Sequence, residues 1–246
     1  MKKITIQQKL EALGVSPDSV IMGDFDYIGR FTAERQRQAD EPNYKKYGSF
    51  YRSNYERGIL IYNLIRMLGC TSMLEIGFGR GYSTFCAARA FHDAGIIGRI
   101  TTIDPAMNEQ YLQMLQQVFP AEWFKYITFA RGTSQEIVPT LNERYDLVYV
   151  DGDHSFNATK LDWELVKGKY DKCILFDDYH MPSKDDPGIQ CREVIDAIQW
   201  EQEGCTEPEL IIGDRRMFFD DRRFTDDQVN YGQVLFTKSG VGRNDW

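Results

Sequence analysis

The chain has 246 residues, of which 42% are hydrophobic and 27% are charged, a balance typical of a globular protein with an apolar core. Its formal net charge of -8 argues against nucleic acid as the main partner, because nucleic-acid-binding proteins present a basic face. No apolar run reaches the ~18 residues that span a bilayer, and residues 1–14 lack the apolar stretch of a signal peptide.

The five cysteines are odd in number and form no CxxC pair. We therefore expect neither a disulfide framework nor a zinc site, and a reducing, cytoplasmic location. The expected partner is a small molecule, with no nucleic acid and no membrane, and a homo-oligomer stays open.

Residues 1–54 are polar, aromatic and irregular, and they form an expected N-terminal helical extension ahead of a domain at residues 55–246. A short helix is expected at residues 6–13. Aromatic residues at the end of the extension are candidates for a lid over an organic acceptor or for a dimer contact, with ordinary packing as the alternative. These residues are Tyr44, Tyr47, Phe50, Tyr51 and Tyr55.

From residue 55 onward, helical and strand patterns alternate. Helices are expected at residues 55–68, 82–91, 107–118, 134–141, 158–166 and 189–200, and strands at 71–77, 99–104, 126–130, 145–151, 172–178, 209–213 and 231–238. The strands are nearly continuous apolar runs, as expected when helices cover both faces of a sheet. The alternation predicts a doubly wound α/β fold with a seven-stranded, mostly parallel sheet whose last strand is antiparallel.

The first strand of this domain ends in the glycine-rich segment EIGFGRG, directly before a helix. Glycines allow a tight turn and a close approach of the backbone to a ligand, and the N-terminus of the helix offers N–H groups. Gly77, Gly79 and Gly81 have the spacing GxGxG, whereas the dinucleotide fingerprint is GxGxxG, so NAD is disfavoured. A glycine-rich turn without a ligand is the alternative.

The second strand ends at Asp104. A carboxylate at this position can accept both hydroxyl protons of a ribose, because it is an acceptor with two oxygens. The alternative is a helix N-cap, since Asp104 and Pro105 precede a helical pattern. In combination with Glu75 and the glycines, the ribose interpretation is preferred.

Acidic residues crowd the ends of the fourth and fifth strands, in VDGDHS and FDDYH. Like charges repel unless a cation or hydrogen-bond donors compensate them. A divalent cation such as Mg²⁺ favours carboxylate oxygens and retains waters. Asp151, Asp177 and Asp178 are therefore the expected metal ligands, with helix capping and solvated acids as the alternative.

The segments LEIGFGRGYST and TTIDP resemble motifs I and II of the class I methyltransferases that depend on S-adenosylmethionine (SAM), and the resemblance covers residues 55–240. It implies a Rossmann-like methyltransferase fold with SAM as cofactor. The glycine turn would hold the methionine and ribose end of SAM, Asp104 the ribose hydroxyls, and the segment after the third strand would lie near the adenine. The residues that this resemblance assigns to the cofactor are Glu75, Gly77, Gly79, Gly81, Asp104, Gly132, Thr133, Ser134 and Asp151.

The DGDHS segment and the paired aspartates after the fifth strand are similar to the metal-dependent branch of this family. That branch contains catechol-type and macrocin-type natural-product O-methyltransferases, including those that act on sugar or macrolide hydroxyls. The resemblance implies Asp151, Asp177 and Asp178 as metal ligands and a hydroxyl of a small organic molecule as methyl acceptor. The N-terminal 50 residues carry no such match.

Two residues compete for the role of catalytic base. A metal on the acceptor oxygen would lower the pKa of that hydroxyl and fix its position, and a base must then take the proton. His154, three residues after Asp151, is preferred because its ordinary pKa of ~6.5 suits proton abstraction. Asp153 occupies the base position of some sugar-modifying relatives. His180 is expected to be a pocket wall, and His92 to be structural.

Three functions stay open at this point. The first is a metal-dependent O-methyltransferase acting on a sugar, polyketide or catechol-like molecule. The second is a metal-independent N- or O-methyltransferase in which the aspartates are structural. The third is a SAM-binding module without catalysis or a nicotinamide-dependent oxidoreductase. The choice of acceptor is expected to depend on residues 1–54 and on the loop 181–188.

Overall fold

The computed structural model describes residues 1–16, 55–179, 189–212 and 232–242. The lid or dimer contact expected within residues 17–54, the pocket-wall role of His180 and the acceptor loop 181–188 all lie outside the described residues. Among the helices in the described ranges, none combines the length and the apolar character that crossing a membrane requires.

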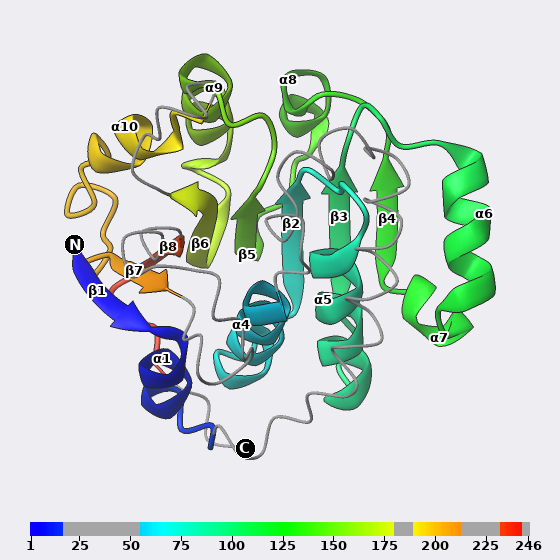
Figure 1. Cartoon of the computed structure of the whole chain (residues 1–246), viewed down its shortest axis with the longest axis horizontal. Coiled ribbons are helices and arrows are strands. Elements are labelled where there is room, and N and C mark those ends of the chain that lie inside the picture. The colour runs from blue at the N-terminus through cyan, green and yellow to red at the C-terminus, as the bar shows by residue number, and fades with distance from the viewer. Residues whose placement is uncertain (17–54, 180–188, 213–231, 243–246) are drawn as a thin grey trace, which may run out of the picture.

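An eight-stranded sheet forms the centre of the molecule, in the order β1-β7-β8-β6-β5-β2-β3-β4 (Figure 1). All neighbouring strands run parallel except β8, which is antiparallel to both β6 and β7. The expectation of a mostly parallel sheet with an antiparallel last strand is therefore confirmed. The strands are Lys2–Thr5 (β1), Ser72–Ile76 (β2), Arg99–Ile103 (β3), Ile127–Ala130 (β4), Tyr145–Val150 (β5), Tyr170–Tyr179 (β6), Glu209–Ile212 (β7) and Gly232–Thr237 (β8).

The sheet has one strand more than the seven expected, because β1 adds to its edge. Lys2–Thr5 pairs in parallel with Glu209–Ile212. The segment KKIT contains a single apolar residue, Ile4, so hydrophobic periodicity gives no strand signal there. The helix that follows, α1 (Ile6–Ala12), was expected, and Thr5 caps it. The start of the predicted extension thus belongs to the sheet.

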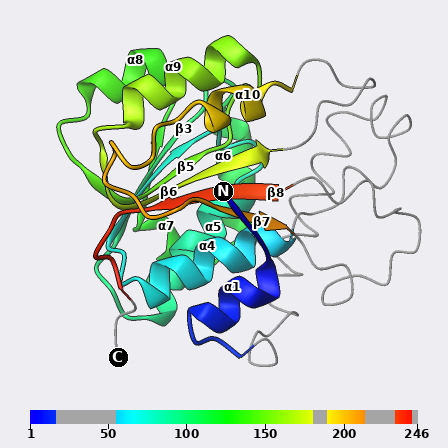
Figure 2. The ribbon, with the colours of Figure 1, turned by 90° about the vertical axis from the view of Figure 1, so that its left-hand side faces the viewer.

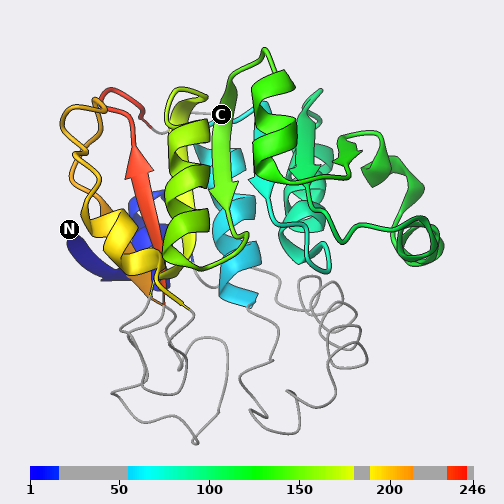
Figure 3. The same cartoon turned by 90° about the horizontal axis from the view of Figure 1, so that it is seen from above.

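Helices cover both faces of the sheet (Figure 2). The helices α1, α4 and α5 lie on one face, and α8, α9 and α10 lie on the other, where Figure 3 shows them over the strands. The short helix α7 was not expected, and α10 is shorter than the predicted 189–200. The remaining bounds are Tyr55–Met67 (α4), Tyr82–Asp93 (α5), Glu109–Val118 (α6), Ala121–Phe124 (α7), Ser134–Ile137 (α8), Val138–Thr140 (the 3-10 turn η3), Phe156–Val166 (α9) and Cys191–Asp196 (α10).

Neighbouring residues of the central strands face two different apolar layers. Met73 and Leu147 pack with α4 and α5, whereas Leu74 and Val148 pack with α9 and α10. All four side chains are fully buried. Full burial of one such side chain contributes about 1.5–3 kcal/mol. Because both faces are covered, apolar residues occupy successive positions and the strands read as continuous apolar runs.

The chain order of the strands reverses beside β2, and this reversal marks the ligand-binding edge. The chain runs outward through β2, β3 and β4, and then returns to place β5 on the other side of β2. Ligands of open α/β sheets bind beyond the carboxyl ends of the strands at such a point. Ile76 of β2 pairs with Val150 of β5, so the segments that follow them leave the sheet side by side.

Candidate active site

The glycine turn after β2 packs directly against the end of β5. Gly77 and Gly79 have φ angles of +92° and +52°, a region that side chains with a Cβ rarely adopt. A Cβ on Gly77 would lie 1.9 Å from the carbonyl oxygen of Asp151, whereas a Cβ on Gly79 would have no atom within 4 Å. Gly77 therefore allows the two strand ends to meet, and Gly79 leaves an open space where a ligand can approach the backbone. Gly81 ends the turn as the N-cap of α5.

Asp104 is tied to the glycine turn by backbone hydrogen bonds. Its Oδ2 accepts from the Gly79 N–H at 2.9 Å, and its Oδ1 accepts from the Ala106 N–H at 2.7 Å. The N-cap of the following helix α6 is Asn108, whose side chain accepts from the Tyr111 N–H. The alternative interpretation of Asp104 as the cap of that helix is therefore wrong.

Glu75 lies beneath the turn, in the core. Its carboxylate is fully buried and accepts hydrogen bonds from the hydroxyls of Ser83, Thr84 and Thr102, the last at 2.6 Å. Burial raises the pKa of the Glu75 carboxyl, and the three hydroxyls act in the opposite direction. The Glu75 side chain thus connects β2 to β3 and to the first turn of α5. It supports the glycine turn from below.

The segment after β4 lies next to Asp104. The Gly132 N–H donates to the carbonyl oxygen of Asp104 at 3.4 Å. Thr133 caps α8 in a reciprocal arrangement with Glu136, whose Oε2 accepts from the Thr133 N–H at 2.9 Å. Ser134 is half-buried, and its hydroxyl donates to the carboxylate of Asp162 on α9. The three residues assigned to the adenine end are thus at the same sheet edge as Asp104.

Asp177 points into the protein and is surrounded by donors. Its side chain has no exposed surface and forms an ion pair with Arg57 of α4. The Tyr149 hydroxyl donates to its Oδ2 at 3.0 Å, and the Gln233 amide donates to its Oδ1 at 2.9 Å. The two hydrogen bonds and the guanidinium offset the free-energy cost of burying the Asp177 carboxylate.

Arg57 also binds Asp151 and so bridges two of the predicted metal ligands. Its Nη1 lies 2.9 Å from Asp151 Oδ2, and the Tyr149 hydroxyl lies 3.2 Å from the same oxygen. Burial raises the pKa of the Asp151 carboxyl, while Arg57 opposes that change. The Nε of Arg57 is buried and has no hydrogen-bond partner among the described residues. No sequence motif indicates a role for Arg57, which lies 94 positions before Asp151.

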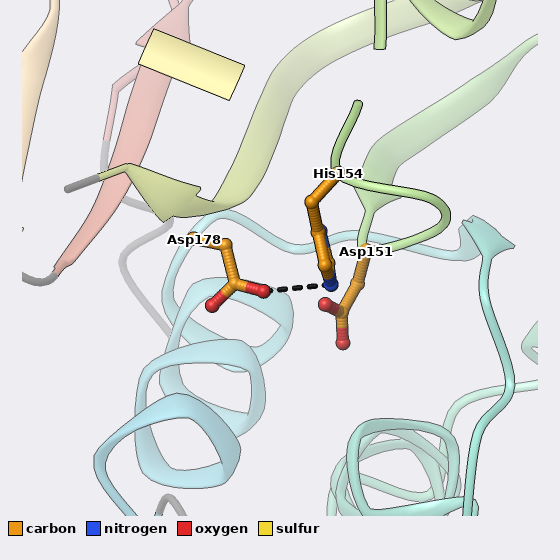
Figure 4. Close-up of side chains that lie close together, drawn as sticks. All are labelled: Asp151, His154 and Asp178. Atoms are coloured by element: carbon orange, nitrogen blue, oxygen red, sulfur yellow. Dashed lines mark ion pairs between the residues drawn. The ribbon is translucent and has the colours of Figure 1, made fainter. Parts of the chain in front are cut away.

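Asp178 has a backbone conformation that turns it toward His154. Its φ angle is 54°, the one positive φ of a non-glycine residue in the described part of the chain. Successive residues of a regular strand point to opposite faces, but the pairing of β6 with β8 is irregular between Phe176 and Tyr179. Asp178 Oδ2 lies 2.8 Å from His154 Nε2 (Figure 4). Such strained backbone is frequent at functional sites.

Asp151, His154 and Asp178 form a group that fits a divalent cation. One ligand atom from each lies within 4.8 Å of the others (Figure 4). Carboxylate oxygens suit Mg²⁺ and Mn²⁺, and an imidazole nitrogen suits transition metals. Asp177 is not part of this group, because Arg57 and its other partners surround it. Of the three predicted ligands, the structure thus brings Asp151 and Asp178 together and adds His154.

The two candidate bases have different surroundings. Asp153 is exposed, and its Oδ1 accepts from the Ser155 N–H at 2.8 Å. The hydrogen bonds with Ser155 lower the pKa of Asp153, which weakens it as a base. Burial lowers the pKa of His154, because it disfavours the charged imidazolium. The hydrogen bonds with Asp178 and Cys191 and the charges of nearby acids have the larger, opposite effect. Together these effects raise the pKa of His154 to about 11. A proton must leave the His154 ring before it can act as a base or bind a cation.

Asp162 is a buried acid whose stability contribution should depend on pH. Burial raises the pKa of Asp162 to about 6 from its ordinary 3.8, against the hydrogen bond from Ser134. The folded state therefore holds this proton more tightly than the unfolded state between these two values. The stabilisation is complete below pH 3.8 and is lost as the pH rises through about 6.

We expect the free energy of unfolding of the wild type, minus that of Asp162→Asn, to fall between pH 4.5 and 7, by up to about 1.4 kcal/mol per pH unit. Urea unfolding followed by circular dichroism at each pH measures this difference. The exposed Glu164→Gln on the same helix is the control and should give a curve parallel to that of the wild type. Parallel curves for Asp162→Asn as well would contradict the expectation.

Comparisons with known proteins support this fold, and the family match includes the glycine turn after β2. A family model described as a methyltransferase domain matches residues 74–179, from β2 to the end of β6. No protein among the curated sequences matches the chain.

Solved structures with the same fold cover most of the chain. The O-methyltransferase TomG from Streptomyces achromogenes, involved in tomaymycin synthesis and in complex with SAM, is 19% identical, with a TM-score of 0.62 over 87% of this chain and 90% of its own. An O-methyltransferase from Bacillus cereus in complex with SAH is 15% identical, with a TM-score of 0.54 over 84% of this chain and 90% of its own. The SAH-bound methyltransferase PaMTH1 from Podospora anserina is 14% identical, with a TM-score of 0.54 over 90% of this chain and 88% of its own.

Proposed function

We propose that the protein transfers the methyl group of SAM to a hydroxyl of a small organic acceptor, because residues 74–179 match a family model described as a methyltransferase domain. The observation that carries the proposal is the meeting of two features at one sheet edge. The open glycine turn at Gly79 contacts the end of β5 through Gly77. The segment that follows β5 carries Asp151 and His154, which meet Asp178 from the end of β6. A cofactor in the turn would therefore lie next to titratable side chains.

The residues at the turn have the chemistry to hold SAM. The open side of Gly79 leaves room for a ligand against the backbone. Asp104 uses its two carboxylate oxygens for one N–H bond each, and an ionised carboxylate offers about four acceptor sites. It can therefore also accept the hydroxyls of a ribose. When bound, SAM supplies a methyl group that its positively charged sulfur activates for displacement.

For the metal-dependent form of the reaction, Asp151 and Asp178 would hold a divalent cation such as Mg²⁺. Bound there, the cation would lower the pKa of the acceptor hydroxyl and fix its oxygen. Asp177 would then act indirectly, because it anchors Arg57 and Tyr149 against Asp151. This proposal retains two of the three ligands that the sequence predicts.

His154 is the proposed acceptor of the hydroxyl proton, and Asp178 orients its ring. The distance of 2.8 Å between His154 Nε2 and Asp178 Oδ2 fixes the imidazole at the edge of the group. Asp153 is less suitable, because its carboxylate is exposed and bound to the backbone of Ser155. The acceptor itself is proposed to be a sugar, polyketide or catechol-like molecule, in agreement with the motifs at the ends of β5 and β6.

Arg57 supports a second candidate, methyl transfer without a metal. Its guanidinium already places a positive charge between Asp151 and Asp177. His154 supplies a second cation beside Asp178. The acidic group is then largely compensated by the chain's own side chains, and the acceptor oxygen could be oriented by them alone.

Methyl transfer from isotope-labelled SAM to a panel of sugars, polyketides and catechols tests both candidates. We expect labelled product in the presence of Mg²⁺ or Mn²⁺ and its loss on addition of EDTA. Full activity in EDTA would exclude the metal-dependent form and favour the role of Arg57. Calorimetric titration with SAM and with NAD is the parallel test, and a protein that binds NAD but not SAM would contradict the proposal as a whole.

A further inference from the structure

Cys191 is a buried thiol that lies against His154. It is the first residue of α10, and 4% of its surface is exposed. Its Sγ lies 3.5 Å from the carbonyl oxygen of His154 and 3.5 Å from the Thr159 hydroxyl of α9. The same side chain forms a hydrogen bond with the His154 imidazole. The thiol thus contacts both the backbone and the ring of His154, and the mechanism proposed above does not use it.

Gln190 holds the same segment from the outside. Its backbone N–H donates to the carbonyl oxygen of His154 at 2.8 Å, and its Oε1 accepts from the Phe156 N–H at 3.2 Å. Phe156 begins α9, and the first N–H groups of a helix have no partner within it. Residues 154–156 are therefore attached to residues 190–191 by backbone and side-chain contacts, so the backbone below the His154 ring is fixed.

The His154 ring has contacts from two different elements. Its Nε2 lies 2.8 Å from Asp178 Oδ2 at the end of β6, and Cys191 contacts it from the start of α10. An imidazole held by one contact can still turn about it, whereas a second contact restricts the ring. A reacting group must be held closely in place, because a misplacement of about 1 Å can cost about a hundredfold in rate.

We propose that Cys191 is a positioning residue for methyl transfer, which holds the His154 imidazole in place to receive the acceptor proton. The proposal rests on the role of His154 in the proposed function. Cys191 lies outside the group of Asp151, His154 and Asp178 that fits a divalent cation, so it acts on the reaction through His154. A serine hydroxyl can form hydrogen bonds in place of the thiol, whereas alanine has no polar side-chain atom.

Methyl transfer from isotope-labelled SAM to the acceptor found in the panel gives the first measurement. We expect Cys191→Ala to lower kcat by about three- to tenfold, the usual effect of one lost hydrogen bond, and Cys191→Ser to recover most of it. KM for SAM and the affinity for S-adenosylhomocysteine (SAH) should stay unchanged. In the His154→Gln background, Cys191→Ala should have no further effect on kcat, because the residue through which it acts is gone.

Cys205→Ala is the matched control. Cys205 is also 4% exposed, so its replacement removes an equally buried thiol. Its partner is the hydroxyl of Tyr170, which begins β6, whereas Asp178 lies near the other end of that strand. Cys205→Ala should therefore keep the kcat of the wild type. An equal loss of kcat in Cys205→Ala and Cys191→Ala would overturn the proposal.

Nuclear magnetic resonance of the isotope-labelled full chain at neutral pH gives a second measurement that needs no acceptor. The ring N–H signal of His154 is identified by its absence from the spectrum of His154→Gln. We expect this signal in the wild type and in Cys191→Ser, because the N–H bonded to Asp178 is protected from exchange with water. In Cys191→Ala we expect its loss. A wild type without the signal would contradict a fixed ring.

The outcomes separate this inference from the proposed function. An unchanged kcat and an unchanged His154 signal in Cys191→Ala would overturn the role of Cys191 and leave the proposed function intact. A wild type that methylates no compound of the panel would contradict the proposed function, and the His154 signal alone then decides whether Cys191 holds the ring. If Cys191→Ala does not fold, as judged by its thermal unfolding, Cys191→Val takes its place, because valine fills the space without a hydrogen-bonding atom.

Discussion

Replacing Arg57 with methionine is expected to lower the free energy of unfolding by about 3–5 kcal/mol, because it leaves a buried carboxylate without its cation. The Asp177 side chain has no exposed surface, and Arg57 is its cationic partner. The same guanidinium also binds Asp151. Tyr149 and Gln233 would remain as donors, but neither carries a charge. Urea unfolding at pH 7 measures the loss.

Two further variants show whether the charge on Asp177 is the cause. Arg57→Lys keeps the positive charge but lacks the planar fork that reaches both carboxylates, so we expect an intermediate loss. In Arg57→Met combined with Asp177→Asn, the charge that needed compensation is gone, and much of the stability should return. A double variant no more stable than Arg57→Met would show that the packing of Arg57, and not its charge, matters.

Replacing His154 with glutamine is expected to lower kcat for methyl transfer by about 10²- to 10⁴-fold, the usual contribution of a general base. Glutamine can still bind Asp178 by a hydrogen bond but cannot take a proton at neutral pH. The affinity for SAH, measured by calorimetry, should stay unchanged. His92→Gln is the matched control, because His92 is exposed on α5, and it should keep full activity.

Binding of Mn²⁺, followed by electron paramagnetic resonance, distinguishes a base from a metal ligand at this position. If His154 is the base, His154→Gln should bind Mn²⁺ as tightly as the wild type does. A loss of Mn²⁺ affinity by more than about tenfold would instead make His154 a ligand, with Asp151 and Asp178 as its partners. Retained activity in His154→Gln would contradict both roles.

Most of the fold could be predicted because its signals are local. The alternation of apolar strands and amphipathic helices depends on residues close together in the chain, and it predicted seven of the eight strands. The expected resemblance to methyltransferases is confirmed over residues 74–179 by the match to a methyltransferase-domain model, and the expected fold is confirmed by the solved structures. Strand β1 could not be predicted from local pattern, because Lys2–Thr5 is stabilised as a strand by its pairing with Glu209–Ile212, about 200 residues later in the chain.

Part of the site could also have been predicted from strand geometry. Tyr149 precedes Asp151 by two residues, and residues two apart in a strand share a face, so its contact with Asp151 follows from periodicity. By the same rule, Asp177 and Asp178 should point to opposite faces. The structure keeps both near Asp151 through the irregular end of β6 and the positive φ of Asp178.

The sequence by itself determined the order of the elements, the glycine turn and the set of acidic residues that reach one sheet edge, because each of these follows from short-range pattern and from the rule that parallel strands end together. Only the tertiary structure decided which partner each acid has. Arg57 forms ion pairs with Asp177 and Asp151, and His154 pairs with Asp178. The Ser134 hydroxyl donates a hydrogen bond to Asp162. The physical reason is that an ion pair or a buried hydrogen bond depends on distances of a few ångströms between distant segments, and those distances are set by how the helices pack on the sheet.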